Sequence, residues 1–261
     1  MIRIQNYVKA ESLDEAYRLN QNKRSRILGG MLWLKQSDIA VHTAIDLTQL
    51  GLDRIEETEE EFSIGAMVTL RQLELHEGLN AYAQGTVAKA VHDIVGVQFR
   101  NMATVGGSIF GRFGFSDVLT VFLAMDTYVE LYKGGIVPLE TFANMEKDRD
   151  ILVRIIVKKR PGRFAYQAMR NQRTDFPVLT CAVSELEGAY RAVIGARPAK
   201  ARTVRDEQGL LADGVNEDSA KAFAAYAAAA VPTGSNVRGS ADYRTHLAQV
   251  LPRRALQELE G

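Results

Sequence analysis

The stretch "NMATVGGSIFGRFGFSDVLTVFLAMD", residues 101–126, decides how the chain folds. Two adjacent glycines, Gly106 and Gly107, follow Thr104, and Asp117 stands further on, at the start of an apolar run typical of a helix. Because glycine lacks a Cβ atom, successive backbone N–H groups around such a pair can converge on one point. An anionic ligand can then approach the chain closely.

A second glycine pair, Gly29 and Gly30, comes after the strand-like run "SRIL". Taken singly, each pair is better explained by an ordinary tight turn, since glycine is common in turns. Two such loops together, however, could hold one pyrophosphate group from two sides.

The composition narrows the class of protein. The 261 residues are 46% hydrophobic and 25% charged, which indicates a globular chain with one or two cores. Basic and acidic residues balance at 32 each, so nucleic acid is not an expected partner. The sequence shows neither a signal peptide nor an apolar run that could span a membrane, and we therefore expect a soluble, cytoplasmic protein without a membrane partner. The single cysteine, Cys181, excludes an intrachain disulfide and cannot by itself hold an iron–sulfur cluster.

Strand-like and helical patterns alternate along the first part of the chain, and strands followed by two helices make up the last part. A turn at Pro161 and Gly162 marks the predicted boundary between domains at 1–159 and 160–261, the first with lobes at about 1–55 and 56–159. Ser12 is the predicted N-cap of the first helix. Strands are expected near residues 1–8, 24–28, 39–47, 62–68, 151–157, 177–186 and 189–196, and a hairpin at 127–142 that turns at Gly134 and Gly135. Helices are expected near 12–21, from 69, and at 85–95, 217–231 and 241–259.

Other catalytic and nucleotide motifs are missing or incomplete. The fingerprint G-x-G-x-x-G does not occur, so a Rossmann-type NAD site has no support. The run "GGSIFGRF" has P-loop spacing, but Arg112 and Phe113 replace the required Lys and Ser or Thr, which leaves a nucleotide triphosphatase as a weak alternative. The four histidines form no metal-binding motif, and Cys181 lies in an apolar strand pattern typical of an inert thiol. We therefore predict no catalytic side chain and no metal ligand.

Several stretches, taken in order, resemble the FAD-binding (medium) subunit of the molybdenum hydroxylases, the xanthine dehydrogenase and carbon monoxide dehydrogenase family. "ILGGMLWL" at 27–34 is similar to the first flavin loop of that family, "QFRNMATVGGSIFGRFGFSD" at 98–117 is similar to the second, and residues 44–74 are similar to the segment between them. "FAYQAMRNQRTDFPVLTCAVS" at 164–184 and "SADYRTHLAQVLPRRALQEL" at 240–259 resemble two stretches of its C-terminal domain. Five motifs in the right order and spacing cover nearly the whole chain.

The resemblance implies an α+β protein, in which a two-lobed α/β FAD-binding domain of the vanillyl-alcohol-oxidase-like type precedes a smaller α+β domain with an antiparallel sheet and helices. It implies an oxidoreductase subunit that carries FAD and passes electrons onward. A molybdenum cofactor is then expected on a large partner subunit and 2Fe-2S clusters on a small one, with NAD or another acceptor receiving the electrons.

The same resemblance assigns the FAD contacts to two loops and to two single residues. Asp117 is expected to accept hydrogen bonds from the ribose or adenine, with a role as a helix N-cap, supported by Ser116, as the alternative. Met31 and Leu32 stand where the family has small polar residues, Ser108 replaces an Asn, and Gln167 stands where Lys is common. The expected contacts are Leu28, Gly29, Gly30, Met31, Leu32, Trp33, Thr104, Val105, Gly106, Gly107, Ser108, Asp117 and Gln167.

Two other functions stay open at this point. One is a self-sufficient FAD-dependent oxidoreductase of the vanillyl-alcohol-oxidase-like family, whose C-terminal domain would form a cap over the substrate. The other is a scaffold that has lost its flavin, which the departures at Met31, Leu32 and Gln167 make conceivable.

Overall fold

A computed structural model describes residues 1–260 as two compact units. Unit 1 contains residues 1–72, 97–111 and 127–157, and unit 2 contains residues 73–96, 112–126 and the chain from Lys158 onward. The sequence places residues 73–96 and 112–126 in the first domain, but they pack with the C-terminal segment. The predicted domain boundary near residue 160 stays a prediction, and the two compact units divide the chain differently.

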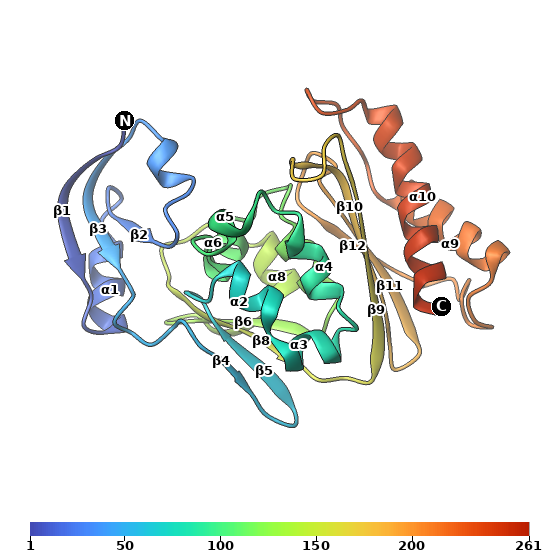
Figure 1. Cartoon of the computed structure of the whole chain (residues 1–261), viewed down its shortest axis with the longest axis horizontal. Coiled ribbons are helices and arrows are strands. Elements are labelled where there is room, and N and C mark those ends of the chain that lie inside the picture. Colours follow the sequence, from blue (N-terminus) through green and yellow to red (C-terminus); the bar gives the residue numbers. More distant parts are fainter. Residues whose placement is uncertain (261) are drawn as a thin grey trace. The chain divides into compact units, whose positions relative to one another are not determined.

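Unit 1 begins with a small parallel sheet. Its strands β1 (Arg3–Lys9), β2 (Arg26–Leu28) and β3 (Ala40–Asp46) lie in the order β1-β3-β2, and both pairings are parallel. Helix α1 (Leu13–Asn20) connects β1 to β2 and lies beside the sheet (Figure 1). The Ser12 side chain accepts a hydrogen bond from the Glu15 N–H at 3.1 Å, which confirms the predicted N-cap.

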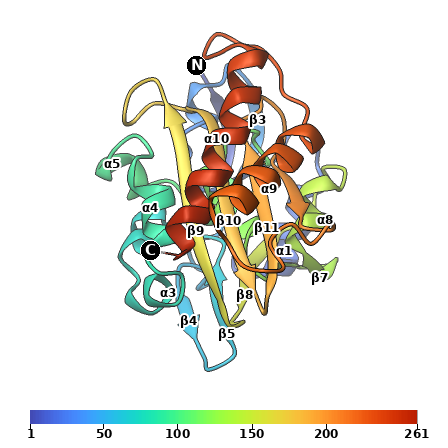
Figure 2. The same ribbon diagram turned by 90° about the vertical axis from the view of Figure 1, so that its right-hand side faces the viewer.

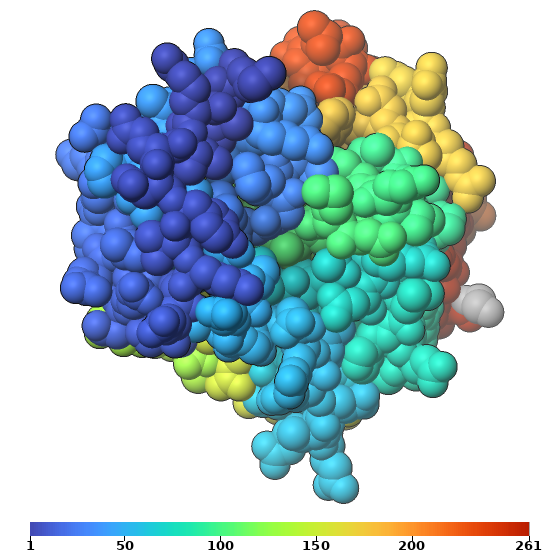
Figure 3. All heavy atoms as spheres, turned by 60° about the vertical axis from the view of Figure 1, so that its left-hand side comes forward, coloured from blue at the N-terminus to red at the C-terminus, as the bar shows by residue number. Residues whose placement is uncertain are grey.

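The second sheet of unit 1 has five strands in the order β4-β5-β8-β6-β7. The predicted strand at 62–68 ends earlier because the chain turns after β5, where the Val68 N–H donates to the Gly65 carbonyl at 3.0 Å. A short helix, α8, follows β7 where the sequence indicates only the end of a hairpin. The tip of the β4–β5 hairpin is exposed and extends into solvent (Figure 3, light blue). The strands are β4 (Ile55–Glu57), β5 (Glu61–Gly65), β6 (Thr127–Leu131), β7 (Gly135–Pro138) and β8 (Leu152–Lys158), and α8 spans Leu139–Asn144.

Short helices surround the second glycine pair. Helix α5 precedes Thr104 and helix α6 begins directly after it, so Gly106 and Gly107 lie in the first turn of α6. The predicted helix at Thr69 begins one residue later. The helices are α2 (Leu70–Leu75), α5 (Val97–Arg100) and α6 (Val105–Phe110).

Unit 2 is built on an antiparallel sheet of four strands in the order β12-β11-β10-β9. The long helices α9 and α10 cover one face of this sheet, and Figure 2 shows them in front of it. Sequence patterns indicate β10, β11, α9 and α10 but neither β9 nor β12. Strand β12 is short and is held by its pairing with β11. The elements are β9 (Gly162–Arg170), β10 (Pro177–Leu186), β11 (Ala189–Gly195), β12 (Arg202–Arg205), α9 (Glu217–Ala230) and α10 (Ala241–Glu260).

Helices from the middle of the chain cover the opposite face. The hydroxyl oxygens of Thr120, in α7 (Asp117–Leu123), and Thr180, in β10, lie 3.1 Å apart. Thr86, at the start of α4 (Thr86–His92), donates to the Phe164 carbonyl of β9 at 2.8 Å. Helix α3 (Glu77–Tyr82) places the Tyr82 ring against Phe164, with centroids 5.4 Å apart. None of the helices described for residues 1–260 combines the length and the hydropathy that a membrane span needs.

Candidate functional site

The two glycine loops of the sequence meet in unit 1. A Cβ atom placed on Gly30 would lie 1.8 Å from the Met102 carbonyl oxygen, and one on Gly29 would lie 2.8 Å from the Thr104 hydroxyl oxygen. These contacts are closer than a side chain allows, so the backbone of the first loop packs on the backbone of residues 102–103 and on the side chain of Thr104. The space-filling view shows a hollow between the N-terminal residues (blue) and the segment around residue 100 (green) (Figure 3).

The first loop has backbone donors that the protein itself does not use. Within residues 1–260, the N–H groups of Gly30, Met31 and Leu32 donate to no backbone or side-chain acceptor. Met31 has a φ of 58°, in the left-handed region, where successive N–H groups can face a common anion. Residues 28–37 include Lys35 and no carboxylate. The loop therefore suits an anionic group.

The Met31 side chain takes no part in that surface. It packs, together with Leu34, against a buried cluster that includes Leu28 and Val41. The side chain thereby anchors the loop to this cluster. Trp33 is 44% exposed.

The second loop uses its donors internally. The Val105 N–H donates to the Val68 carbonyl at 2.8 Å, and the Gly106 N–H donates to the Ala66 carbonyl at 2.9 Å. The Gly107 N–H donates to the Thr104 hydroxyl at 3.1 Å, and the Ser108 N–H donates to the Thr104 carbonyl at 3.1 Å. Within residues 1–260 the N–H groups of the second loop are thus engaged and those of the first loop are not, and the contact of both loops with one anion stays a prediction.

Gly106, in the second glycine pair, packs closely against Ala66. A Cβ atom on Gly106 would lie 2.5 Å from the Ala66 carbonyl oxygen and 2.7 Å from the Ala66 Cβ. The glycine lets α6 approach the segment after β5 without a clash. Its role in the structure is close packing.

Asp117 is buried in unit 2 at the first position of α7, directly after the N-cap Ser116. Its Oδ1 atom accepts hydrogen bonds from the Tyr166 hydroxyl and, at 2.5 Å, from the Arg170 guanidinium. Burial raises the pKa of the Asp117 carboxyl, while the Arg170 charge and the Tyr166 hydrogen bond oppose that shift. The alternative, in which Asp117 itself is the N-cap, is wrong in its residue, because Ser116 caps α7 by accepting from the Leu119 N–H at 3.0 Å. A ribose or adenine contact of Asp117 stays a prediction.

Gln167 lies on the other face of the sheet in unit 2. Neighbouring residues of a strand point to opposite faces, and Tyr166 faces α7, whereas Gln167 faces α10. There the Gln167 amide donates to Glu258 at 2.5 Å, and Glu258 also pairs with Lys89 at 2.6 Å. Gln167 and Asp117 therefore lie on opposite faces of this sheet, and the expected FAD contact of Gln167 stays a prediction.

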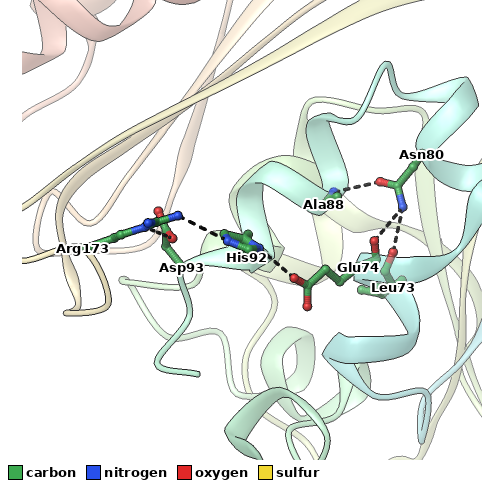
Figure 4. A network of polar contacts seen from close by, with 7 residues as sticks. All are labelled: Leu73, Glu74, Asn80, Ala88, His92, Asp93 and Arg173. Carbon is green, nitrogen blue, oxygen red and sulfur yellow. Dashed lines mark hydrogen bonds and ion pairs between the residues drawn. The ribbon is translucent and has the colours of Figure 1, made fainter. Parts of the chain in front are cut away.

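His92 lies next to the carboxylate of Glu74. The Nδ1 atom of His92 lies 2.8 Å from the Oε1 atom of Glu74, a buried residue (Figure 4). The Asn80 side chain donates to the carbonyls of Leu73 and Glu74, and accepts from the Ala88 N–H, so this network ties α2, α3 and α4 together. No group of His, Cys, Asp and Glu in residues 1–260 could hold a metal ion.

Sequence reasoning missed the groups on which the glycines pack. Met102 and Ala66 contribute carbonyl oxygens, which every residue has, so no side-chain pattern could have marked them. Tyr166 belongs to a stretch that resembles the family, but its bond to Asp117 follows from tertiary structure alone.

Two family models together match most of the chain. The model described as "FAD binding domain in molybdopterin dehydrogenase" matches residues 2–159, and that described as "CO dehydrogenase flavoprotein C-terminal domain" matches residues 164–259.

Individual proteins agree with these matches. The glyceraldehyde dehydrogenase medium chain of Sulfolobus acidocaldarius is 24% identical over 280 residues, covering 97% of each chain. Carbon monoxide dehydrogenase from Hydrogenophaga pseudoflava superposes with a TM-score of 0.88 at 24% identity, covering 98% of this chain and 97% of its own. Quinoline 2-oxidoreductase from Pseudomonas putida 86 superposes with a TM-score of 0.86 at 19% identity, covering 99% and 96%. The chain therefore belongs to the family of FAD-binding subunits of the molybdenum hydroxylases, oxidoreductases of the carbon monoxide and xanthine dehydrogenase type.

Proposed function

We propose that this chain holds FAD with its diphosphate at the first glycine loop. The observation that supports the proposal is the set of three N–H groups, at Gly30, Met31 and Leu32, that have no acceptor within residues 1–260. A diphosphate is a strong acceptor for such donors. Neither this loop nor residues 101–111 carry a carboxylate that would repel it. The residues present thus fit the anionic part of FAD.

When bound, FAD supplies the redox chemistry, since a flavin can take electrons singly from clusters and deliver them in pairs to an acceptor. The residues of this chain would then bind and orient the FAD. Gly29 and Gly30 keep the loop close to residues 102–104, and the Met31 side chain anchors it in the cluster below. Leu28 and Trp33 flank these donors. No side chain needs to act as an acid or base.

We further propose that the chain works in a complex with a large subunit that holds a molybdenum cofactor and a small subunit that holds 2Fe-2S clusters. Only the similarity to known proteins supports this arrangement, since the relative from Sulfolobus acidocaldarius is named a medium chain. NAD or another acceptor would receive the electrons. The lone, buried Cys181 fits the placement of iron–sulfur clusters on another chain.

We also propose that the FAD-binding domain is of the vanillyl-alcohol-oxidase-like type. A three-stranded parallel sheet and a five-stranded sheet in unit 1 are consistent with two lobes of the vanillyl-alcohol-oxidase-like type. A self-sufficient oxidase of that family would use the C-terminal part as a substrate cap. The match of residues 164–259 to a carbon monoxide dehydrogenase flavoprotein domain favours the subunit instead.

The test is purification of the tagged chain from its native host, with flavin absorbance, iron and molybdenum measured in the same sample. We expect FAD, iron and molybdenum to co-elute in fixed proportion. A yellow chain that elutes alone would contradict the complex and favour the self-sufficient oxidase. A colourless chain that gains no flavin spectrum when soaked in FAD would contradict FAD binding and favour a scaffold.

A further inference from the structure

Two arginine side chains of unit 1 meet at one backbone carbonyl group. The Ser25 carbonyl oxygen accepts a hydrogen bond from the Arg26 guanidinium at 2.7 Å and another from the Arg149 guanidinium at 3.0 Å. Ser25 is buried, and both arginines are half-buried. Two positive charges are therefore held within a few ångströms of each other, where like charges repel.

No carboxylate offsets these two charges. Within residues 1–260, Arg26 and Arg149 form no ion pair, and they donate only to backbone carbonyls and to the Asn20 side chain. Asp148 and Asp150, which flank Arg149 in the sequence, accept from backbone N–H groups instead. Burial and the Arg26 charge both lower the pKa of Arg149. An anion bound between the two guanidinium groups would relieve this repulsion.

Both guanidinium groups keep N–H groups that nothing in residues 1–260 accepts. Arg26 donates through Nη1, which leaves its Nε and Nη2 groups, and Arg149 donates through Nε and Nη2, which leaves Nη1. A guanidinium presents its donors as a rigid planar fork that matches the oxygens of an oxyanion. Lys23 and Arg24 are exposed in the same loop, and residues 16–37 contain no carboxylate.

These four basic residues, Lys23, Arg24, Arg26 and Arg149, form what we call the arginine cluster. The cluster lies where β2 begins, because Arg149 donates to the carbonyls of Asn20 and Asn22 at the end of α1. The first glycine loop follows the other end of β2, after a strand of three residues that rises about 10 Å. The arginine cluster and the glycine loop are therefore different features of unit 1.

We propose that the arginine cluster binds a phosphoryl group, either as free inorganic phosphate or as part of a small phosphate monoester. A phosphoryl group near neutral pH carries about 1.5 to 2 negative charges, so it offsets more of the positive charge than a single carboxylate does. Its oxygens also accept charge-assisted hydrogen bonds from several donors at once. This site is separate from the FAD diphosphate and does not rest on the proposed function.

Isothermal titration calorimetry on the full chain saturated with FAD tests the site. Inorganic phosphate is titrated while NaCl keeps the ionic strength constant. We expect Arg26→Gln to weaken phosphate binding about tenfold, because one charge and its charge-assisted hydrogen bonds are lost. Arg54→Gln is the matched control, since it removes an exposed positive charge elsewhere in unit 1 and should leave the affinity unchanged.

Two further variants separate the fork from the charge and guard against misfolding. Arg26→Lys keeps the positive charge but lacks the planar fork, so its affinity should lie between those of the natural protein and R26Q. Arg149→Gln should also weaken phosphate binding, but Arg149 braces the end of α1. Circular dichroism therefore checks that R149Q is folded, and the Arg26 variants decide if it is not.

The source of the phosphoryl group is distinguished by a second titration, with glycerol 2-phosphate. Tighter binding of this monoester than of inorganic phosphate assigns the site to an esterified ligand, and the reverse order assigns it to free phosphate. An absence of binding, or equal phosphate affinity of R26Q and R54Q, would overturn the inference. Phosphate binding that FAD abolishes would also overturn it, by placing the phosphate at the glycine loop. A chain that takes up no FAD contradicts the proposed function, and the comparison of R26Q with R54Q still decides this inference.

Discussion

At the scale of single residues, Gly30 shows that a position can require glycine because another backbone segment lies too close for a side chain, and not because of its own φ angle. Its φ lies outside the left-handed region, yet any side chain would meet the Met102 carbonyl oxygen. Gly51 is the opposite case, with a φ of 67° and no atom within 4 Å of the point where a Cβ would be. Gly30 thus forms a contact between two segments distant in sequence, and its substitution should act through packing.

We expect Gly30→Ala to destabilise the FAD-free protein by about 1–3 kcal/mol, because the new methyl group forces the backbone of residues 30 and 102 apart. Urea denaturation followed by circular dichroism measures the change. Gly107→Ala is the matched control, since its Cβ would meet only the Thr104 hydroxyl oxygen, at 3.0 Å. Equal stability of G30A and the natural protein would mean that the close approach does not exist in solution.

The buried ion pair between Arg170 and Asp117 predicts a second effect at this scale. Arg170→Met leaves the Asp117 carboxylate buried with Tyr166 as its remaining side-chain donor, which should cost about 3–5 kcal/mol. The comparison is Arg173→Met, which breaks an exposed pair with Asp93 at 3.0 Å and should cost about 0–1 kcal/mol. Thermal unfolding of both variants measures the difference. Similar melting temperatures would show that the Asp117 pair contributes no more than a surface pair.

At the scale of elements, the last helix of unit 2 is fastened by one fully buried arginine. Arg244 of α10 donates to the Val178 carbonyl at 2.9 Å, to the Gly234 carbonyl at 2.7 Å and to the Asn236 side chain at 2.6 Å. It also donates to the Gly239 carbonyl. The guanidinium thereby joins α10, β10 and the loop before α10.

We expect Arg244→Met to cost about 3 kcal/mol or more, since one buried and three part-buried acceptors lose their donor at once. Limited proteolysis should then cut first in the loop at residues 232–240, which loses its attachment. Arg254→Met, at an exposed position of the same helix, is the control and should leave the cutting rate unchanged. Protection of the loop in R244M would contradict the anchoring role.

At the scale of the whole molecule, the chain passes repeatedly between two compact units. Segments 73–96 and 112–126 leave unit 1 and join the core of unit 2. Segments of the two units alternate along the sequence, so neither unit corresponds to one continuous half of the chain. Removing residues 160–261 should leave the helices of those two segments without the sheet that they cover.

Cys181 provides a probe of folding in unit 2. The side chain is fully buried in the core between the sheet and its two long helices, and burial raises the pKa of the thiol well above its ordinary value. At pH 8 the thiol thus stays protonated and unreactive in the folded protein. We expect a thiol reagent to label Cys181 only as urea unfolds unit 2. Fast labelling of the native chain would show that this core opens readily.

The amino-acid sequence by itself determined the family and most of the long elements. Ordered motifs spread over the chain identified the flavin subunit, and local periodicity indicated β10, α9 and α10 and the Ser12 cap, since such patterns depend on neighbours along the chain. Short elements were missed: β12 is held by pairing with β11, and α8 has too few residues for a clear period.

Only the tertiary structure decided which backbone donors at the two glycine pairs are already engaged. The sequence pattern predicts the same role for both glycine pairs. In the structure, the backbone N–H groups around the second pair donate to Ala66, Val68 and Thr104, whereas those of residues 30–32 have no acceptor within residues 1–260. The fold also placed Asp117 and Gln167 on opposite faces of one sheet. Which donor is already engaged, and which face a side chain occupies, depends on atoms contributed by distant segments, and no local pattern contains that information.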